Sequence, residues 1–406
     1  MDGVIPNLKH LRACEAVLRT GSFSAAANEV FMSQPAVTQA VAKLEMVLGS
    51  VLFDRRPEGV FATDIGRLFV NRVGRMQHYL ATGMAEIMRS ARRQHGQTAK
   101  LHHLVTSVQL RALVAIAEAG NFSLAARSIG ISQPSLHRAA RDLEHLCAVP
   151  LFEKASSGIL LTKLAEILVM NTKLALMELD QAYDEIEAWK GGRGGRVAIG
   201  SMPLARSAIL PAAVNDLLGQ APDTRISIID GPYRELLFAL RHGDIDILIG
   251  ALRDPVPVDD VVQERLFDDP LAIVARVNHP LMTKDNITLN DLAACAWIVP
   301  RRGAPTREYF ETMFPDGGPR PQSVIVTGSL VLIRRLLSTS NQLTIISRHQ
   351  IAQEEKYGEL RRLPLALSDT ERPIGITTRK GWSPTAIQRD FLSRLTDIGR
   401  RANEIW

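Results

Sequence analysis

Two segments of the chain carry polar side chains that could read DNA. In the first segment these are Gln34, Thr38, Gln39 and Lys43, and in the second they are Gln133, Ser135, His137, Arg138 and Arg141. Glutamine and arginine can form paired hydrogen bonds with one base edge, worth about 1–3 kcal/mol of base discrimination, and cations can pair with phosphates. For any single residue a solvated polar surface is the alternative, but the pattern as a whole predicts binding to double-stranded DNA.

Each segment also carries a signal for the start of a helix. Ser33 and Ser132 are both followed by Gln-Pro. Serine suits the N-cap of a helix, and a proline in the first turn costs no helical hydrogen bond. Helix-turn-helix proteins place the N-terminal residues of such a helix in the major groove. We therefore count Ser33, Pro35 and Ser132 among the predicted DNA-binding residues.

The two segments belong to one unit that occurs twice, 99 residues apart and without a gap. From residue 11 to residue 70, about 20 of the 60 aligned positions are identical. The first copy begins with an apolar stripe at helical spacing, made of Leu8, Leu11, Cys14 and Leu18. Gly21 or Gly120 then suits a chain reversal before a short alanine-rich helix. Such self-similarity marks a supersecondary unit that is used more than once.

Both copies continue into a predicted hairpin, or wing. Leu-Phe at residues 52–53 and 151–152 begins it, and the tips fall at residues 55–59 and 154–158. The tip cations are Arg55 and Arg56 in the first copy and Lys154 in the second. A cation at a wing tip adds affinity for the phosphate backbone without sequence information.

These motifs resemble those of the LysR-type transcriptional regulators, whose N-terminal module is similar to GSFSAAA, SQPAVTQAVAKLE, LFDRR and T-x-x-G in this chain. The resemblance implies a sequence-specific DNA-binding regulator controlled by a small effector. The family normally has one such module rather than two. The C-terminal part resembles the subgroup of the galactose-binding-protein regulator, which implies sugar-derived or aromatic acids as effectors.

The two copies differ in charge and in two motif positions. Residues 1–99 hold 12 Lys and Arg against 8 Asp and Glu, a balance of +4, whereas residues 100–190 hold 9 against 10, a balance of −1. The second copy has Ala165 where the first has Gly66, and Ala155 where the first has Arg56. We therefore expect the first copy to supply most of the DNA affinity and the second to be the degenerate one.

Composition indicates a soluble multidomain protein. The net charge of +5 favours an acidic partner, and no apolar run approaches the about 20 residues that span a bilayer. We expect a cytoplasmic protein with no membrane partner, no cofactor and no metal site. Three cysteines form no ligand spacing. Cys14 aligns with Leu113 and Cys147 with Leu48, so both are predicted to be small core residues.

A long helical segment follows each copy, at residues 65–93 and 164–190, and each carries a stripe of apolar residues. In the resembling family this helix makes the dimer contact. We therefore expect at least one of the two to pair between chains, giving a homodimer or homotetramer, with packing inside the chain as the alternative. A glycine-rich break at residues 191–195 ends this half of the chain.

From residue 196 onward short β-branched runs alternate with helical segments, which indicates βαβ units and a parallel sheet. The resemblance implies two lobes joined by two crossovers, like a periplasmic binding protein. The fold class is thus multidomain: two tandem winged helix-turn-helix domains at 1–99 and 100–190, then an α/β effector domain at 196–406. Its lobe one is expected at about 196–266 and 366–400, and its lobe two at about 267–365.

Effector ligands of such sheets bind at the carboxyl ends of strands, where helix N-termini favour anions. The residues that follow the predicted strands are Ser201, Met202, Gly231, Pro232, Arg301, Arg302, Thr306, Thr327 and Gly328. We predict that these groups hold a small organic acid. Loop or capping duty is the alternative for each, and Thr306 and Ser329 are also possible N-caps.

Two other functions are weighed against an effector-controlled DNA-binding regulator. An enzyme is disfavoured because the chain has no glycine-rich phosphate loop, no GxSxG and no HExxH, so no catalytic residue is predicted. A co-regulator that does not read DNA and acts by dimerising with LysR-like proteins remains open, because the second copy departs from the family pattern.

Overall fold

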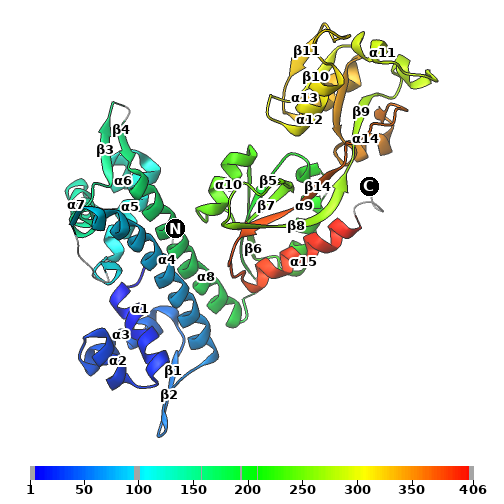
Figure 1. Cartoon of the computed structure of the whole chain (residues 1–406). Coiled ribbons are helices and arrows are strands. Elements are labelled where there is room, and N and C mark those ends of the chain that lie inside the picture. The colour runs from blue at the N-terminus through cyan, green and yellow to red at the C-terminus, as the bar shows by residue number, and fades with distance from the viewer. Residues whose placement is uncertain (1–4, 96–100, 157, 193, 208, 402–406) are drawn as a thin grey trace. The chain divides into compact units, whose positions relative to one another are not determined.

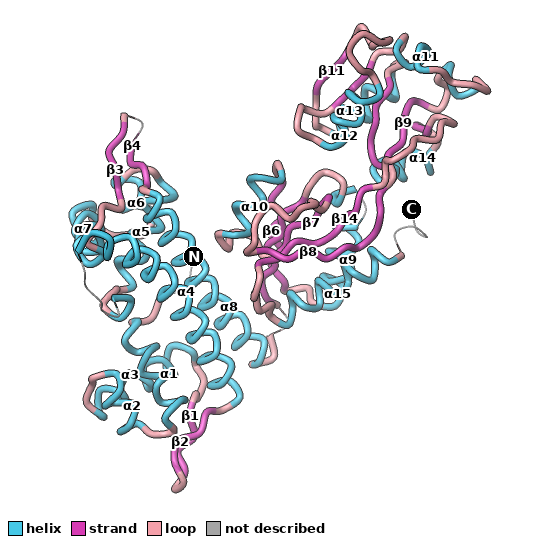
Figure 2. The backbone as a smooth tube through the Cα atoms, in the orientation of Figure 1, coloured by secondary structure: helices cyan, strands magenta, loops and turns pink. Residues whose placement is uncertain are grey.

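The computed structural model describes residues 5–95, 101–156, 158–192, 194–207 and 209–401 (Figures 1 and 2). It divides into two compact units. One comprises Met1–Arg196 with Asp223–Arg225 and Arg241–Asp244, and the other comprises Val197–Pro222, Ile226–Leu240 and Ile245–Trp406. The expected boundary between residues 99 and 100 lies outside the described residues, as do Ser157 of the second wing tip and Arg193 of the glycine-rich break.

The first unit contains one order of elements twice, each time three helices, a hairpin and a long helix (Figure 1). The first series is α1 (Leu8–Thr20), α2 (Phe23–Val30), α3 (Gln34–Leu48), β1 (Phe53–Arg56), β2 (Gly59–Ala62) and α4 (Asp64–His95). After the short 3-10 helix η1 (Leu101–His103), the second series is α5 (Ser107–Ala119), α6 (Phe122–Ser128), α7 (Gln133–Cys147), β3 (Phe152–Ala155), β4 (Gly158–Leu161) and α8 (Lys163–Trp189). We call α1–β2 module one and α5–β4 module two.

Local sequence signals explain where these helices begin and end. Ser33 and Ser132 are the N-caps of α3 and α7, as predicted, and their side chains accept hydrogen bonds from the backbone N–H groups of Ala36 and Ser135. Gly21 ends α1 with a φ of 62°, in the left-handed region that glycine adopts without a steric penalty. Gly120 ends α5 in the same way, with a φ of 59°, so these caps correspond in the two modules.

The predicted core role of two cysteines is confirmed. Cys14 and Cys147 are both buried and both are free thiols. Burial raises the pKa of both thiols, that of Cys147 to about 12, with smaller contributions from neighbouring glutamates. Neither thiol is therefore ionised near neutral pH, which fits a packing role rather than a reactive one.

The long helices α4 and α8 pack against each other within the chain. The expectation that one of them pairs between chains stays a prediction. Their buried apolar side chains belong to one core, which includes Phe69, Val73, Met76, Leu80, Met84 and Ile87 of α4 and Leu168, Ala175, Leu179, Ala182 and Ile186 of α8. The physical reason is that each apolar stripe already has a partner in the other copy of the repeat. The alternative considered from the sequence, packing inside the chain, is what occurs.

The contacts along this pair fix its direction. A Cβ atom on Gly83 of α4 would lie 2.9 Å from Cβ of Asn171, near the start of α8. Nearer the start of α4, Arg72 instead contacts Glu178 and Glu185, near the end of α8. The two helices therefore run antiparallel, and hairpins β1–β2 and β3–β4 lie at opposite ends of the pair (Figure 1).

In the second unit, one sheet has the strand order β6-β5-β7-β14-β8. Its strands are β5 (Gly195–Ser201), β6 (Thr224–Asp230), β7 (Ile247–Ala251), β8 (Val261–Asp269) and β14 (Arg372–Arg379). Its helices are η2 (Ala205–Ser207), α9 (Ile209–Gln220), α10 (Tyr233–Arg241) and α15 (Ala386–Arg400). Buried residues of β5, β7, β14, α9 and α15 form its main core, so helices and sheet make one lobe.

The other sheet has the order β11-β10-β12-β9-β13. Its strands are β9 (Leu271–Arg276), β10 (Trp297–Val299), β11 (Val324–Val326), β12 (Leu343–Ser347) and β13 (Leu360–Arg362). Its helices are η3 (Pro280–Thr283), α11 (Leu289–Ala293), α12 (Pro305–Met313), α13 (Leu330–Thr339), η4 (Arg348–Ile351) and α14 (Ala352–Tyr357). This second lobe has its own core around Trp297, Phe310 and Phe314.

The structure corrects two details of the sequence-based description of this half. Both sheets are mixed rather than parallel, because β14 returns antiparallel to β7 and β8, and β9 is antiparallel to β12 and β13. Strand β8 ends at Asp269 and β14 begins at Arg372. Strand β13 was not predicted, because its residues Leu360–Arg362 include two arginines and lack an apolar run.

Among the described residues, no helix combines the length and the hydropathy that crossing a membrane requires.

Candidate DNA-binding and effector-binding sites

Helix α3 presents the predicted polar face of module one. Gln34, Gln39 and Lys43 are exposed and Thr38 is half-buried. The opposite face packs into the core through Val37, Ala40, Val41, Leu44 and Leu48. Burial, and then the charge of Lys43, lower the pKa of His10 on α1, so His10 is neutral at pH 7 and leaves Lys43 as the cation of this face.

Helix α7 presents the corresponding face of module two, but several of its polar groups already have partners. The Ser123 hydroxyl donates to Oε1 of Gln133 at 2.9 Å, and the hydroxyls of Ser132 and Ser135 lie 2.8 Å apart. The His137 ring stacks on Phe122 with 4.0 Å between centroids. Arg138 and Arg141 are exposed. The residues that face outward here are therefore held in place by neighbours of the same module.

The two wings are antiparallel hairpins of equal length, β1–β2 and β3–β4. Arg55 is exposed, and its guanidinium lies 4.6 Å from the centre of the Phe23 ring, a cation–π contact that orients it. Arg56 lies 5.4 Å from the Phe61 ring and 3.5 Å from the Asp54 carboxylate. In module two Lys154 is exposed and Ala155 replaces the second arginine. The wings thus differ by one cation.

One residue pair that fixes the wings was not among the predicted site residues. Glu45 accepts a hydrogen bond from the backbone N–H of Leu52 at 2.8 Å, and Glu144 accepts one from Leu151 at 2.8 Å. Each glutamate thereby ties the end of the exposed helix to the start of the wing. The repeated Leu-Glu pair in the sequence was the available signal, because an acidic residue kept in both copies of a basic surface suggests a backbone contact.

Gly66 lets the start of α4 approach module one closely. The Thr63 hydroxyl donates to the carbonyl oxygen of Val51 at 2.8 Å, and the N–H of Gly66 donates to the Thr63 hydroxyl at 2.9 Å. A Cβ atom on Gly66 would overlap the carbonyl group of Leu52, with its carbon only 2.9 Å away. In module two the buried Ala165 fills the aligned position. Ala165 is accommodated there, so it does not mark a broken fold.

Replacing Gly66 by Ala is therefore expected to destabilise the protein by about 1–3 kcal/mol, the usual range for overpacking. The reverse change, Ala165→Gly, removes no clash and is expected to cost about 1 kcal/mol of helix propensity. Urea unfolding followed by circular dichroism measures both. A Gly66→Ala protein as stable as the native chain would show that the Leu52 backbone moves aside at no cost.

The effector candidates of lobe one lie at two neighbouring strand ends. Ser201 ends β5, is fully buried, and its hydroxyl lies 3.3 Å from the carbonyl oxygen of Met202. Met202 is half-buried, and its backbone N–H donates to the carbonyl oxygen of Ile249 at 3.0 Å. Gly231 and Pro232 follow β6, which is the neighbour of β5 in the sheet, and precede α10. These four residues are thus on one edge of the lobe-one sheet.

The candidates of lobe two also follow neighbouring strands. Arg301 and Arg302 are exposed after β10, and the N–H of Thr327, after β11, donates to the carbonyl oxygen of Val299 at 2.9 Å. Gly328 is exposed beside Thr327. Strands β10 and β11 are parallel neighbours, so these residues lie at one sheet edge.

The capping alternatives have opposite outcomes. Ser329 is the N-cap of α13, and its side chain accepts a hydrogen bond from the N–H of Leu332. Thr306 is not an N-cap, because α12 begins at Pro305 and its N-cap position is Ala304, which has no capping side chain. The proline moves the start of α12 one residue ahead of Thr306, which therefore lies in the first turn.

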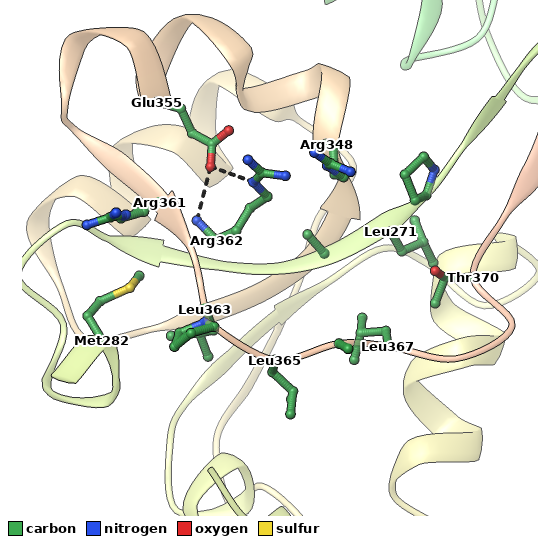
Figure 3. A pocket seen from close by; sticks show the side chains of 14 residues that line it. Leu271, Met282, Arg348, Glu355, Arg361, Arg362, Leu363, Leu365, Leu367 and Thr370 are labelled. Carbon is green, nitrogen blue, oxygen red and sulfur yellow. Dashed lines mark hydrogen bonds and ion pairs between the residues drawn. The ribbon is translucent and has the colours of Figure 1, made fainter. Parts of the chain in front are cut away.

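A cavity of about 530 Å³ lies in lobe two, and none of the nine effector candidates lines it. Figure 3 shows its lining residues. Leu271, Met282, Leu363 and Leu365 contribute apolar side chains. Its cationic side chains are Arg348, Arg361 and Arg362, and Arg362 donates to the Glu355 carboxylate at 2.8 Å. This cavity was not predicted, because the unpredicted strand β13 and the following loop supply much of its wall.

A buried polar cluster joins the two crossover segments between the lobes. Asp269, the last residue of β8, is fully buried and accepts hydrogen bonds from the Ser347 hydroxyl and from Arg372, the first residue of β14. The His349 ring nitrogen Nδ1 lies 2.8 Å from the same carboxylate. Both chain crossings are thus tied to one side chain, so Asp269 holds the junction of the lobes.

Helix-turn-helix elements with wings, joined to a separate two-lobed α/β domain, define a DNA-binding protein controlled by a bound effector. Comparisons with known families agree. The family "Bacterial regulatory helix-turn-helix protein, lysR family" matches residues 8–67 and 108–166, and the family "LysR substrate binding domain" matches residues 190–399.

The chain is 34% identical over 390 residues to the HTH-type transcriptional regulator GalR of Pseudomonas putida, covering 95% of this chain and 96% of that one. It is 31% identical over 246 residues to the HTH-type transcriptional regulator GbpR of Rhizobium radiobacter, covering 59% of this chain and 80% of that one. Full-length OxyR from Pseudomonas aeruginosa shares the fold, with a TM-score of 0.54 and 23% identity over 72% of this chain and 94% of that one.

This chain therefore belongs to the LysR family of transcriptional regulators, with a DNA-binding helix-turn-helix and an effector-binding domain. Nothing in these comparisons supports the alternative of a co-regulator that does not read DNA.

Proposed function

We propose that both winged helix-turn-helix modules bind operator DNA and that the C-terminal domain shifts the bound arrangement when it takes up a small organic acid. The observation that carries the proposal is the outward polar face that α3 and α7 each present beside a cationic wing tip. Two matches of the helix-turn-helix family, at residues 8–67 and 108–166, support a tandem arrangement.

The proposed DNA contacts fall into two groups. Base reading is assigned to Gln34, Thr38, Gln39 and Lys43 in module one and to Gln133, Ser135, His137, Arg138 and Arg141 in module two. Arg55, Arg56 and Lys154 are assigned to phosphates, while Ser33, Pro35 and Ser132 set the helix starts. Gln133, Ser135 and His137 have neighbours in module two, so their reach toward DNA is more restricted.

Anisotropy titration with labelled DNA tests this assignment. The probe is the duplex upstream of the protein's own gene, with an equally long scrambled duplex as the reference. Specific binding is expected to be at least 10³-fold tighter than binding to the scrambled duplex. Equal affinity for the two duplexes at several salt concentrations would reject sequence reading by both modules.

For the effector, we propose Ser201, Met202, Gly231 and Pro232 of lobe one with Arg301, Arg302, Thr306, Thr327 and Gly328 of lobe two. Support comes from their positions after neighbouring strands and from the two exposed guanidinium groups, which suit a carboxylate. Sugar-derived and aromatic acids, which the family resemblance of the sequence implies, are the first ligands to try. The ligand shifts the equilibrium between two conformational states, because it binds one of them more tightly than the other.

A panel of such acids is expected to contain at least one that stabilises the protein by mass action, by about 2.7 kcal/mol at 100 times its dissociation constant. Differential scanning fluorimetry finds it. The double variant Ser201→Ala, Thr327→Ala is expected to weaken its binding, because both hydroxyls lie at the proposed strand ends. An acid that keeps its full affinity for this double variant would place the site elsewhere, with the cavity around Arg348 as the next location to test.

A homodimer or homotetramer in the cytoplasm, with no cofactor and no catalytic activity, stays a prediction. Its original basis, the apolar faces of the long helices, is satisfied inside the chain. We therefore expect any association between chains to use other surfaces. Sedimentation velocity at micromolar concentration measures it.

A further inference from the structure

We infer that a single chain carries a complete two-headed DNA-binding unit, in which α4 pairs with α8 of the same chain, and that this unit binds an asymmetric duplex site in one fixed orientation. The inference rests on the proposed DNA-binding role of both modules. It concerns how they are joined and what kind of site the joined pair can occupy.

The α4–α8 pair is built like two copies of one helix facing each other. The 99-residue repeat aligns Arg72 with Asn171 and Gly83 with Ala182. In the structure Gly83 approaches Asn171, and Arg72 donates to Gln181, the neighbour of Ala182, at 2.7 Å. A contact made in one direction across the pair is therefore matched, to within one residue, by a contact in the other direction. Both halves of this two-sided arrangement come from one polypeptide.

The polar residues that α4 and α8 contribute to their contact are nevertheless different. Arg72 of α4, only 4% exposed, donates to Glu178 at 2.8 Å and to Glu185 at 2.6 Å. Arg75 donates to Glu178 at 2.8 Å, and the Glu178 side chain is fully buried. Burial alone lowers the pKa of Arg72, but the bonds to Glu185 and Glu178 outweigh it, so its pKa is raised and the guanidinium is fully charged. The cations are thus on α4 and the acceptors on α8.

This distribution of charged groups favours the pair of α4 with α8 over a pair of two α8 helices or of two α4 helices. Two α8 helices in the same arrangement would place Glu178 opposite Asn171 and Leu174, the residues that align with Arg72 and Arg75. A buried carboxylate would then lack a cation, which is strongly disfavoured. Repulsive or unpaired groups in the wrong complex are how related helices select their partners. We therefore expect α8 to pair with α4 and not with α8 of another chain.

A pair of two α4 helices would lose the same hydrogen-bond network, because Arg72 would lack its acceptors. Arg72 would face Tyr79, Thr82 and Glu86, which align with Glu178, Gln181 and Glu185. One carboxylate would then replace the two carboxylates and the amide that hold Arg72. The buried guanidinium would keep fewer of its acceptors, so this pair is also less favourable than α4 with α8.

A further contact joins the end of one series to the start of the other. The Lys190 ammonium, just after α8, donates to the carbonyl oxygen of Leu48 at 2.6 Å. Leu48 is the last residue of α3. The residue that follows α8, the long helix after module two, therefore caps α3, the exposed helix of module one. A cation at the C-terminus of a helix also complements its dipole. The position of α3 is thus fixed by a helix that begins beside the wing of module two.

The two heads joined in this way present different chemistry. Module one has exposed Gln34 and Gln39 and two arginines at its wing, whereas module two has exposed Arg138 and Arg141 and one lysine at its wing. Different side chains select different base edges, since arginine favours guanine and glutamine favours adenine. The two half-sites should therefore differ in sequence, and the unit should lie on them in one direction only.

Cleavage of DNA from each wing tests the orientation. The probe is a duplex enriched by repeated selection from a random library with the full-length chain. In a Cys295→Ser background, an iron chelate that generates hydroxyl radicals is attached to Glu58→Cys in wing one or to Ser156→Cys in wing two; neither residue is among the proposed contacts. We expect each chelate to cut near one end of the duplex, the two chelates at opposite ends, with at least a tenfold preference.

A mixing experiment tests whether the heads are joined within one chain. One variant carries Gln34→Ala with Gln39→Ala, and the other carries Arg138→Ala with Arg141→Ala; each is expected to bind the selected duplex at least tenfold more weakly. Co-expressed from one cell, the two variants should not recover the native affinity and footprint, because no chain then has two intact heads. Recovery of both would show that the two heads bound to one site come from different chains, and would overturn the inference.

The outcomes separate this inference from the function on which it rests. Comparable cutting at both ends by both chelates would overturn the fixed orientation while leaving DNA binding intact. Failure of the selection to enrich any duplex would overturn sequence-specific binding itself, and with it the inference. Cutting at one end only, combined with no recovery on mixing, is the result that only a single-chain, two-headed unit gives.

Discussion

Replacing Arg72 by Ala is expected to lower the free energy of unfolding by about 3–5 kcal/mol, the cost of breaking a buried ion pair by removing one partner. Arg72 is 4% exposed, and it holds Glu178, Gln181 and Glu185 through four of its N–H groups. Without the guanidinium, Arg75 is the cation that stays paired with the fully buried Glu178 among the described residues. The penalty comes chiefly from the carboxylate that remains buried and not from lost contact area.

Urea unfolding of the full chain, followed by circular dichroism at 222 nm, measures this change. The matched control is Arg89→Ala on the same helix, because Arg89 pairs with Glu86 at the surface and is 67% exposed. Exposed pairs contribute about 0–1 kcal/mol, so the control should stay near the native value. Equal losses in both variants would mean that the Arg72 network does not hold α4 and α8 together.

The contrast between Arg72 and the caps explains which features the sequence could predict. Ser33 and Ser132 were identified as N-caps because capping depends on a few neighbouring residues, here Ser-Gln-Pro. Arg72 and Glu178 are 106 residues apart, and no local pattern links them. The apolar stripes on α4 and α8 indicated that both helices are covered, but a stripe carries no information on whether its partner is in the same chain.

Prediction of the effector domain from its sequence was limited in the same way, over shorter segments. Strong β-branched runs such as those of β7 and β12 were predicted, because burial on both faces gives them a continuous apolar sequence. The short β13, Leu360–Arg362, escaped prediction since it pairs only along β9 and has an exposed arginine. The cavity that β13 borders was missed with it. Candidate effector residues could be placed at strand ends, yet which of them face a ligand depends on side-chain directions that a sequence does not contain.

The wing of module one is expected to contribute more to DNA affinity than the wing of module two. Arg55→Ala with Arg56→Ala should reduce the slope of log K against log salt by up to about 2, because each lost phosphate contact removes about 0.9. At 0.15 M salt this corresponds to about a 30-fold loss of affinity. Lys154→Ala removes a single contact and should reduce the slope by no more than about 1.

The structure adds a reason to expect a large effect from Arg55 in particular. Its guanidinium lies over the Phe23 ring, so part of the entropy of holding the side chain is already lost before DNA binds. Arg56 must leave Asp54, 3.5 Å away, to reach a phosphate fully, so its contribution should be the smaller of the two. The single variants therefore rank as Arg55→Ala above Arg56→Ala in lost affinity.

Anisotropy titrations of the full-length chain between 50 and 200 mM salt distinguish these contributions from a general loss of positive charge. The control is Lys284→Ala, which also removes one positive charge but lies in lobe two, paired with Asp291. Its slope should equal that of the native chain, because Lys284 is paired with Asp291 and is not among the proposed DNA contacts. A larger loss of affinity from Lys154→Ala than from the double arginine variant would reverse the ranking of the modules. Both wings are fixed to the exposed helices by equivalent glutamates, Glu45 and Glu144. A poorly anchored wing in module one could therefore not explain such a reversal. It would have to reflect a closer approach of module two to the phosphates.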